Sequence, residues 1–434
     1  MAKILDGQRY KCSLAAMQSV QAIPGAIPVL HSGPGCAAKL SDTIGSSGHY
    51  SPNIFPCTSL NEKDVVFGGT RKLRTTIENA MKVLDADLYI VLTGCIPEIV
   101  GDDSVSVVDE FREAGKPVIL AETAGFRGNS YTGYEQVLDA ITDQYLEPAP
   151  EGEREKGLVN IFADVPYQAL FWLGNYEQLA KLVSLLGLTP NVIFGYEGGT
   201  DRVRDIPKAE FNLLVSPWVG IEPMERMEKR LGIPFLHWPN LPVGAFETSK
   251  FLRALGEYAG VPSDKVESVI ADQEGYYYYL IERYADLFLE TRVMAKQFTV
   301  SADAQYSLAL TKFLVNDLSL NPATQFVVDD TPKKYRESVA AEFSNLNHGI
   351  KAPVEFETDS WKISQAIRAH DYHGYPLVLG SYWEKEVTEE MYGHYLNISW
   401  PVQDKVVMDE SYVGYQGGIK VIEDIYSVAV QRWN

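Results

Sequence analysis

The sequence predicts an α/β fold, and two observations carry this prediction. Short apolar runs typical of buried parallel strands alternate with stretches in which apolar residues recur at helical spacing. At 434 residues the chain is also too long for one hydrophobic core. We therefore predict three Rossmann-like domains with parallel sheets, at 1–150, 151–296 and 297–434, with a charged, proline-rich boundary at 147–156.

In the predicted first domain, each strand leads through a turn into a helix. Residues 1–20 are polar to mixed, and we expect them to wrap onto a neighbour instead of forming a core. Helices are expected from residue 37 and over 71–84, and strands at 26–31, 88–92 and 117–123.

The second and third domains repeat this alternation. Four strands of the second domain are expected at 158–163, 192–194, 211–215 and 234–236, followed by a long helical stretch at 249–295. The strands of the third domain are expected at 298–303, 324–328, 377–379 and 397–400, and a terminal helix at 417–432.

Charge and hydropathy limit the partners of the chain. Its 58 acidic and 38 basic residues give a net charge of −20. This balance excludes nucleic acid and an anionic membrane surface as partners, and it suits docking to a protein with a basic face. No apolar run reaches the length of about 18 residues that spans a bilayer. The N-terminus is not of the signal-peptide type, so we expect a cytoplasmic location.

The four cysteines, Cys12, Cys36, Cys57 and Cys95, all lie in the first quarter of the chain. In a large chain expected in the cytosol, such clustering indicates metal or redox chemistry more than disulfides. No Cys-x-x-Cys pair occurs, so zinc ribbons and ferredoxin-type clusters fit poorly. Ligands so far apart would have to converge from separate loops.

Cys95 stands at the end of the predicted strand 88–92, and Pro97 suits the first turn of a helix behind it. Cys36 has the same arrangement after the strand 26–31. Both thiols are therefore expected at the carboxyl edge of one sheet, where a helix end favours the thiolate that a soft metal centre requires. The ordinary alternative for any single cysteine is a small buried side chain that fills space.

Neither phosphate-loop pattern, G-x-x-x-x-G-K-[ST] or G-x-G-x-x-G, occurs in the sequence, so we expect that no nucleotide is bound by this chain. If nucleotide energy is used, a partner binds the nucleotide. Phe67 precedes Gly68 and Gly69, where a loop apex is expected. For Phe67 alone, a core aromatic is the ordinary interpretation.

Four segments resemble hallmarks of the nitrogenase component 1 superfamily. They are Leu-Asn-Glu-Lys-Asp-Val-Val-Phe-Gly-Gly at 60–69, Cys-x-x-Glu-x-x-Gly-Asp-Asp at 95–103, Gly-x-x-x-Thr-Gly at 128–133, and Tyr-Val-Gly-Tyr-Gln-Gly-Gly at 412–418. The last segment is most similar to β-type subunits. The resemblance covers nearly the whole chain and implies three successive α/β domains.

The resemblance implies a β-type subunit that holds half of an [8Fe-7S] P-cluster or a related iron–sulfur cluster, shared with an α-type subunit. Matched to the family's pattern, the iron ligands are Cys12, Cys36 and Cys95, whereas Cys57 matches no ligand position. Phe67 falls where the family contacts its ATP-dependent iron protein, so docking becomes the favoured interpretation. The implied assembly is α2β2, with the active-site metal cofactor in the α-type subunit. This chain would relay electrons and contain no catalytic residue of its own.

The sequence also departs from the family's pattern. Ser32 and Pro34 stand where nitrogenase β subunits usually have Gly and Gln. Gly125 stands where many molybdenum enzymes have a serine that joins the cluster on oxidation, so the resemblance does not extend to that redox-linked ligand. The N-terminal arm is also shorter than is usual in the family's β subunits.

These departures favour a nitrogenase-like reductase of methylthio-alkanes, such as methylthio-alkane reductase, which cleaves a C–S bond. The alternatives are a dinitrogenase β subunit that serves N2 reduction and a cofactor-assembly scaffold of the same fold. The substrate and the metal of the partner's cofactor stay open at this point.

Overall fold

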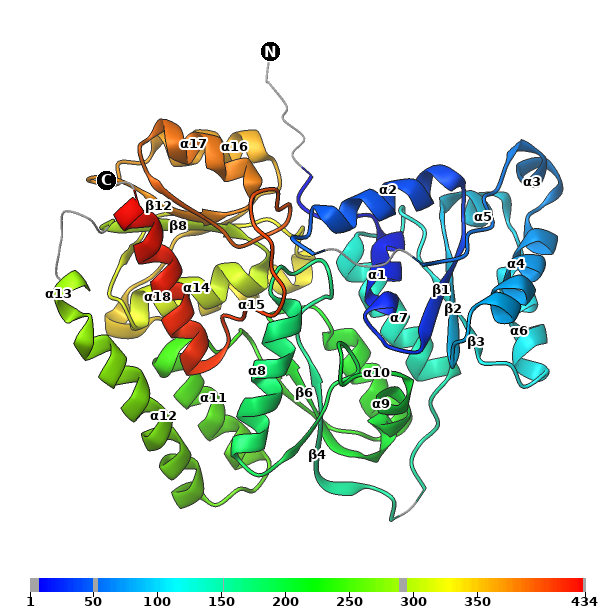
Figure 1. Cartoon of the computed structure of the whole chain (residues 1–434), viewed down its shortest axis with the longest axis horizontal. Coiled ribbons are helices and arrows are strands. Elements are labelled where there is room, and N and C mark those ends of the chain that lie inside the picture. Colours follow the sequence, from blue (N-terminus) through cyan, green and yellow to red (C-terminus); the bar gives the residue numbers. More distant parts are fainter. Residues whose placement is uncertain (1–7, 50–53, 151, 289–294, 432–434) are drawn as a thin grey trace.

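The computed structural model describes residues 8–49, 54–150, 152–288 and 295–431. Three parallel sheets, each flanked by helices, confirm the predicted α/β architecture (Figure 1). The boundaries between the predicted domains stay a prediction. Within the described residues, no helix is long and apolar enough to cross a membrane.

The first sheet has the order β1-β2-β3. Its strands are β1 (Ala26–His31), β2 (Leu88–Thr93) and β3 (Val118–Glu122), close to the predicted ranges. Every residue of β2 is buried, because helices cover both faces of the sheet. One face packs against α1 (Ala16–Gln21) and α7 (Ser130–Gln144), and the other against α4 (Thr70–Val83) and α6 (Ser104–Glu113).

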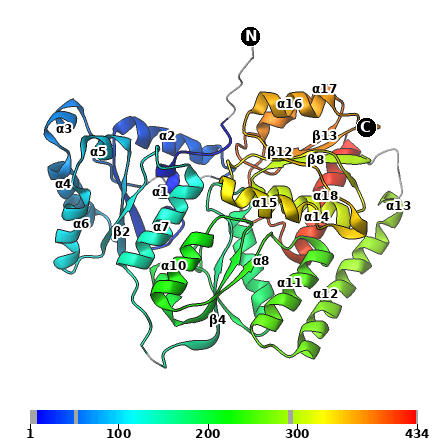
Figure 2. The same cartoon turned by 180° about the vertical axis from the view of Figure 1, so that it is seen from behind.

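The second sheet has the order β5-β4-β6-β7. Its strands are β4 (Glu155–Phe162), β5 (Thr189–Asn191), β6 (Ala209–Val215) and β7 (Phe235–Trp238). The predicted strand 192–194 was wrong, because strand pairing ends at Asn191. The accompanying helices are α8 (Trp172–Leu185), α9 (Thr200–Asp205) and α10 (Ile221–Leu231). We call each sheet together with its helices a unit. Helix α10 lies beside α7 of the first unit (Figure 2).

The long helical stretch predicted at 249–295 is broken. Its described part forms α11 (Gly244–Tyr258), α12 (Ser263–Arg283) and α13 (Ala285–Phe288), and residues 289–294 lie outside the described residues. The turn between α11 and α12 contains Gly260, at φ 65°, and Pro262. A glycine in the left-handed region ends helices readily, and proline restarts them at their first turn.

The third sheet has the order β11-β10-β8-β12-β13, with β9 also paired to β8. Its strands are β8 (Gln297–Ala302), β9 (Asn321–Pro322), β10 (Gln325–Val327), β11 (Val354–Phe356), β12 (Leu377–Gly380) and β13 (His394–Asn397). The strand predicted at 397–400 ends at Asn397 instead. The helices of this part are α14 (Ala304–Asn316), α15 (Lys333–Glu342), α16 (Ser360–Ala369), α17 (Lys385–Glu390) and α18 (Gly414–Gln431).

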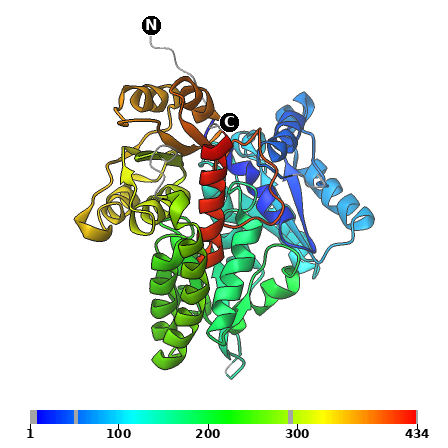
Figure 3. The ribbon, with the colours of Figure 1, turned by 60° about the vertical axis from the view of Figure 1, so that its left-hand side comes forward.

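The terminal helix α18 runs back against α11 of the second unit (Figure 3). A Cβ on Gly418 would lie 2.5 Å from the Cα of Gly244, so the two helices meet where neither residue has a side chain. This close approach uses the glycines of the segment 412–418, and it ties the end of the chain to its middle.

The expectation that residues 1–20 wrap onto a neighbour was wrong for the described part, residues 8–20. Leu14, Met17 and Val20 are buried in the main hydrophobic core. The small side chains beside them let this arm lie against α7, where the carbonyl oxygen of Ser13 occupies the space a Cβ on Gly133 would need. Composition alone did not reveal this packing, because the arm's polar residues are buried as well.

One of these polar residues is Arg9, which is 3% exposed. It forms a two-pronged ion pair with the buried Glu384, at 2.5 and 3.0 Å. Removing one partner of such a pair leaves a buried charge and costs about 3–5 kcal/mol. The pair therefore fixes the arm against the third unit.

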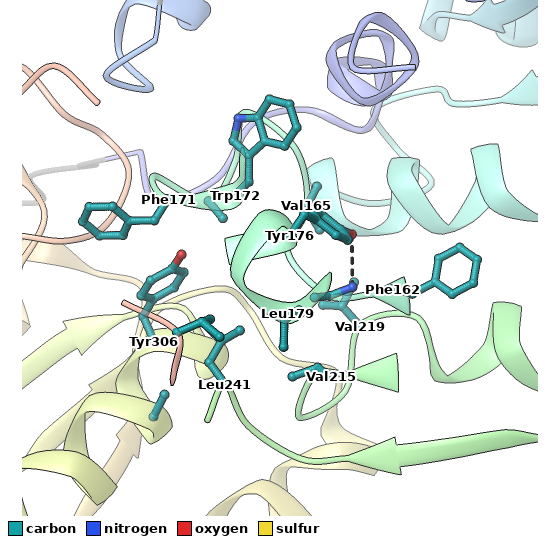
Figure 4. Close-up of a cluster of buried hydrophobic side chains, with 14 of the residues drawn as sticks. Phe162, Val165, Phe171, Trp172, Tyr176, Leu179, Val215, Val219, Leu241 and Tyr306 are labelled. Atoms are coloured by element: carbon teal, nitrogen blue, oxygen red, sulfur yellow. Dashed lines mark hydrogen bonds between the residues drawn. The ribbon is translucent and has the colours of Figure 1, made fainter. Parts of the chain in front are cut away.

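The carboxyl ends of β4, β8 and β10 lead to the buried carboxyl groups of Asp164, Asp303 and Asp329. Beside them lies a cluster of buried hydrophobic side chains that includes Phe162, Trp172 and Tyr306 (Figure 4). Tyr306 donates a hydrogen bond to Asp164 at 3.0 Å, and Trp218 donates to Asp329 at 2.9 Å. Burial, with the nearby carboxylate of Asp329, raises the pKa of Asp303 to about 8. These bonds join the second and third units across their shared core.

Candidate functional site

The first sheet brings its strand ends to one level. In the parallel register, Thr93 of β2 pairs with His31 of β1 and with Glu122 of β3. The segments that follow these strands carry Cys36, Cys95 and Gly125, and the strand order places these segments side by side. Parallel sheets gather ligand-binding turns at this edge.

Cys95 is the first residue of α5 (Cys95–Val100), as the strand–turn–helix pattern predicted. Gly94 forms the N-cap, and a Cβ there would lie 2.8 Å from the Cβ of Ser32. The turn of β1 and the turn of β2 can therefore touch only because residue 94 is glycine. Pro97 lies in the first turn of the helix, where its missing N–H costs nothing.

Cys36 lies inside a helix and not in the turn where the sequence placed it. The helix α2 (Pro34–Gly45) begins with Pro34 at its first position, three residues earlier than predicted. Proline fits there because its fixed φ matches the helix. The thiol of Cys36 thus lies in the first helical turn and is exposed on the isolated chain.

Cys12 reaches the same edge from the N-terminal arm. It pairs in a short antiparallel bridge with Asn129, and Ser130 N–H donates to the Lys11 carbonyl at 2.8 Å. Lys11 itself is buried, and its ammonium group donates to Gln18 at 2.7 Å. These contacts hold Cys12 beside the turn that follows β3.

Gly125 lies between two of the thiols. Its N–H donates to the Cys95 sulfur at 3.2 Å, and a Cβ there would lie 2.8 Å from Cys12 Sγ and 3.3 Å from Cys95 Sγ. Burial raises the pKa of Cys12, and the charges of Cys95 and Cys36 raise it further. The structure thus places Cys12 and Cys95 on either side of Gly125, and Cys36 lies near enough for its charge to affect Cys12.

These thiols form an open donor set. All four cysteines of the chain are free of disulfides, and Cys12 and Cys36 are exposed. Across the described ranges, no three His, Cys, Asp or Glu side chains are close enough to hold one metal ion. Thiolate sulfur is the ligand type that holds iron–sulfur clusters, so the chemistry of these donors fits such a group.

Glu98 holds the Gly125 turn against α5, a role that sequence analysis missed. Its carboxylate accepts from Thr93 Oγ1 at 2.5 Å, from Ala124 N–H at 3.3 Å and from Arg127 Nε at 2.6 Å. The spacing Cys-x-x-Glu puts Glu98 one helical turn after Cys95, on the same side of the helix, and that spacing was the available signal.

Cys57 is bonded to the end of strand β1 and the residue after it. It forms a parallel bridge with Leu30, and its half-buried sulfur contacts the Ser32 carbonyl at 3.6 Å. It does not contribute to the shifted pKa of Cys12.

Phe67 is not a core aromatic. It ends α3 (Glu62–Phe67) and is 84% exposed. Val66 and Ile99 are likewise more than two-thirds exposed, and α3 contacts α5. We call Val66, Phe67 and Ile99 the apolar knob.

A chain with three parallel α/β sheets and thiols gathered at a sheet edge invites comparison with known redox proteins. Residues 12–429 match the model of the family described as "Nitrogenase component 1 type Oxidoreductase". The chain belongs to this family, as a subunit similar to its beta chains.

Similar curated proteins are beta chains of the nitrogenase molybdenum-iron protein. That of Clostridium pasteurianum is 23% identical over 447 residues, covering 96% of this chain and 92% of its own. That of Azotobacter vinelandii is 22% identical over 446 residues, covering 94% and 80%. The solved structure "Nitrogenase Cp1 at pH 6.5" superposes with a TM-score of 0.79 at 20% identity, over 98% of this chain and 93% of that one. The structural likeness shows the shared fold.

Gly125→Ala is expected to spoil the donor set while leaving the fold intact. The new methyl group would press on the sulfurs of Cys12 and Cys95, so iron uptake by the chain assembled with its partner should fall several-fold. Iron and sulfide analysis measures this.

Gly35→Ala is the matched control, because it lies next to Cys36 and no atom lies within 4 Å of its added Cβ. Equal iron in both variants would contradict the placement of Gly125 at the site.

Proposed function

We propose that this chain is the β-type subunit of a nitrogenase-like two-component reductase. It would hold half of a P-cluster-type iron–sulfur cluster, shared with an α-type subunit that carries the active-site metal cofactor. The observation that carries the proposal is the placement of Cys12 and Cys95 against Gly125, with Cys36 in the first turn of the helix that follows the neighbouring strand, in a chain of this family.

Cys12, Cys36 and Cys95 are the proposed iron ligands. When bound, an iron–sulfur cluster supplies one-electron transfer. The chain's own contribution would be to supply three sulfurs and to donate the Gly125 N–H to that of Cys95. The exposure of Cys12 and Cys36 supports a second subunit that covers the other side, in an α2β2 assembly.

The apolar knob is the proposed contact for an ATP-dependent iron protein. Val66, Phe67 and Ile99 expose apolar surface next to the helix that begins at Cys95. Exposed apolar patches of this kind mark protein interfaces. A partner docked there would lie close to the segments that carry the thiols. Electrons would then have a short path from the partner to the proposed cluster.

The proposed substrates are methylthio-alkanes, whose C–S bond takes up two electrons and two protons to give methanethiol and a hydrocarbon. The departures from the pattern of nitrogenase β subunits at Ser32, Pro34 and Gly125 support this choice over N2. Analysis of the products of the assembled complex decides it. Ammonia from N2, without methanethiol, would overturn the substrate while leaving the cluster proposal standing.

The alternative is an assembly scaffold of the same fold, on which cofactor precursors mature. A scaffold needs no electron relay, and its cluster should be simpler. Electron paramagnetic resonance of the isolated and oxidised complex distinguishes the two.

Replacing Cys12, Cys36 or Cys95 by Ala is expected to lower the iron affinity of the assembled complex at least about tenfold, because each change removes a ligand. Iron content and the paramagnetic signals of each purified variant measure the loss. Cys57→Ala is the control and should keep its iron, since its thiol is separate. Full iron content in the Cys95 variant would rule out the ligand role.

Phe67→Ala is expected to weaken binding of the iron protein by about 2 kcal/mol, roughly thirtyfold, because a central aromatic anchor is lost. Titration of the iron protein against the assembled complex measures this, and the iron content should not change. Tyr196→Ala is the control, since Tyr196 is 95% exposed on another part of the chain. The same weakening in both variants, or in neither, would remove the knob as the docking site.

A further inference from the structure

We propose that Asp102 is a positioning residue that links the loop carrying Phe67 to the turns carrying Cys36 and Cys95. The inference rests on the proposed function, which gives those turns and that loop their separate roles. The juxtaposition behind it is a buried carboxylate held between the Gly69 N–H and the His31 imidazole.

The first contact of Asp102 is with the loop after Phe67. Gly69 N–H lies 2.8 Å from Oδ1 and 3.0 Å from Oδ2 of the carboxylate. A Cβ on Gly69 would lie 2.6 Å from Oδ2, and one on Gly68 would lie 3.3 Å from Oδ1. The loop therefore rests directly on the carboxylate, with no intervening side chain.

The second contact joins Asp102 to Cys95 through α5. Gly101 adopts the left-handed conformation that ends this helix, at φ 78°. The Asp102 N–H then donates to the Pro97 carbonyl at 2.9 Å. Because α5 has only six residues and Cys95 is the first, Asp102 and Cys95 are opposite ends of one short hydrogen-bonded unit.

The third contact joins Asp102 to the strand that leads to Cys36. His31, the last residue of β1, places Nε2 3.1 Å from Oδ2 of Asp102. The two side chains are 0% and 3% exposed. The His31 carbonyl also accepts from Gly94 N–H at 2.9 Å, so the two cysteine-bearing turns are bonded to each other.

These three contacts make one connected unit from the knob to the thiols. A close-packed interior transmits small displacements, because it leaves no free volume to absorb them. A partner that presses on the loop after Phe67 would therefore shift Asp102, and with it the turns of Cys36 and Cys95. The next residue, Asp103, differs in its role: its carboxylate accepts hydrogen bonds from Ser106 and caps helix α6.

The test is the alkylation rate of each cysteine by iodoacetamide, followed by mass spectrometry on the full chain without metal. Gly69→Ala places a methyl group 2.6 Å from Asp102 Oδ2, 2.7 Å from Leu60 Cδ2 and 3.0 Å from His31 Cε1, although the Gly69 φ of −99° suits alanine. We expect Cys36 and Cys95 to react at least about fivefold faster, with Cys12 within about twofold of wild type. Gly45→Ala, on the same helix as Cys36 and with no atom within 4 Å, should change nothing.

A double-mutant cycle separates coupling from general damage. In an Asp102→Ala background, Gly69→Ala should raise the labelling rates less than it does in the wild-type chain, because the clash with the carboxylate is gone while the clashes with Leu60 and His31 remain. Asp102→Asn keeps an acceptor for the Gly69 N–H and should restore slow labelling, and Asp103→Asn should match wild type.

Unchanged rates for Cys36 and Cys95 in Gly69→Ala would overturn the proposal, as would an equal rise at Cys12 or additive effects in the cycle. The labelling needs neither iron nor a partner. If the wild-type complex contained no iron, the proposed function would be refuted. The labelling experiment would still show whether Asp102 links the loop after Phe67 to Cys36 and Cys95.

Discussion

The parallel register of β1, β2 and β3 is the constraint on which the rest of the structure depends. Because β2 is buried on both faces, its pairing cannot slip by one residue without turning every side chain to the opposite face. That register sets His31, Thr93 and Glu122 level. The segments that follow the three strands therefore start at the same level of the sheet. Cys36 and Cys95 lie in two of these segments, although they are far apart in the sequence.

Glycine residues allow the turns at this edge of the first sheet to pack closely. At Gly94 and Gly125, the space of a side chain is taken by Ser32 or by the sulfurs, and at Gly69 by Asp102. Each glycine costs conformational entropy on folding. The bonds of Glu98 and Asp102, which fasten the same turns, offset that cost. At this edge of the first sheet, the carboxylates of Glu98 and Asp102 hold the turns in place, and the glycines let the turns approach one another closely.

The sequence predicted what is local. The buried strands, the helix at Cys95 and the position of Cys36 and Cys95 after strands of one sheet follow from apolar runs and turn residues, and the structure has these strands, this helix and this sheet. It missed what depends on distant packing: the buried arm that delivers Cys12, the break between α11 and α12, and the roles of Glu98 and Asp102. Asp102 stands in a quoted motif, yet its partners Gly69 and His31 are 33 and 71 residues away.

The open edge has an electrostatic consequence. Cys12 lies near two other thiols, and partial burial, with a smaller effect of charge on Cys95 and Cys36, raises its pKa, so this thiol resists deprotonation in the isolated chain. A bound metal cluster would supply the missing positive charge, and a covering subunit would remove the water that now reaches Cys12 and Cys36. Under the proposed function, each event favours the other, because thiolates stabilised by metal gain most when water is excluded. Metal loading and subunit assembly would then be thermodynamically linked, and the half-site on this chain would be completed only in the complex.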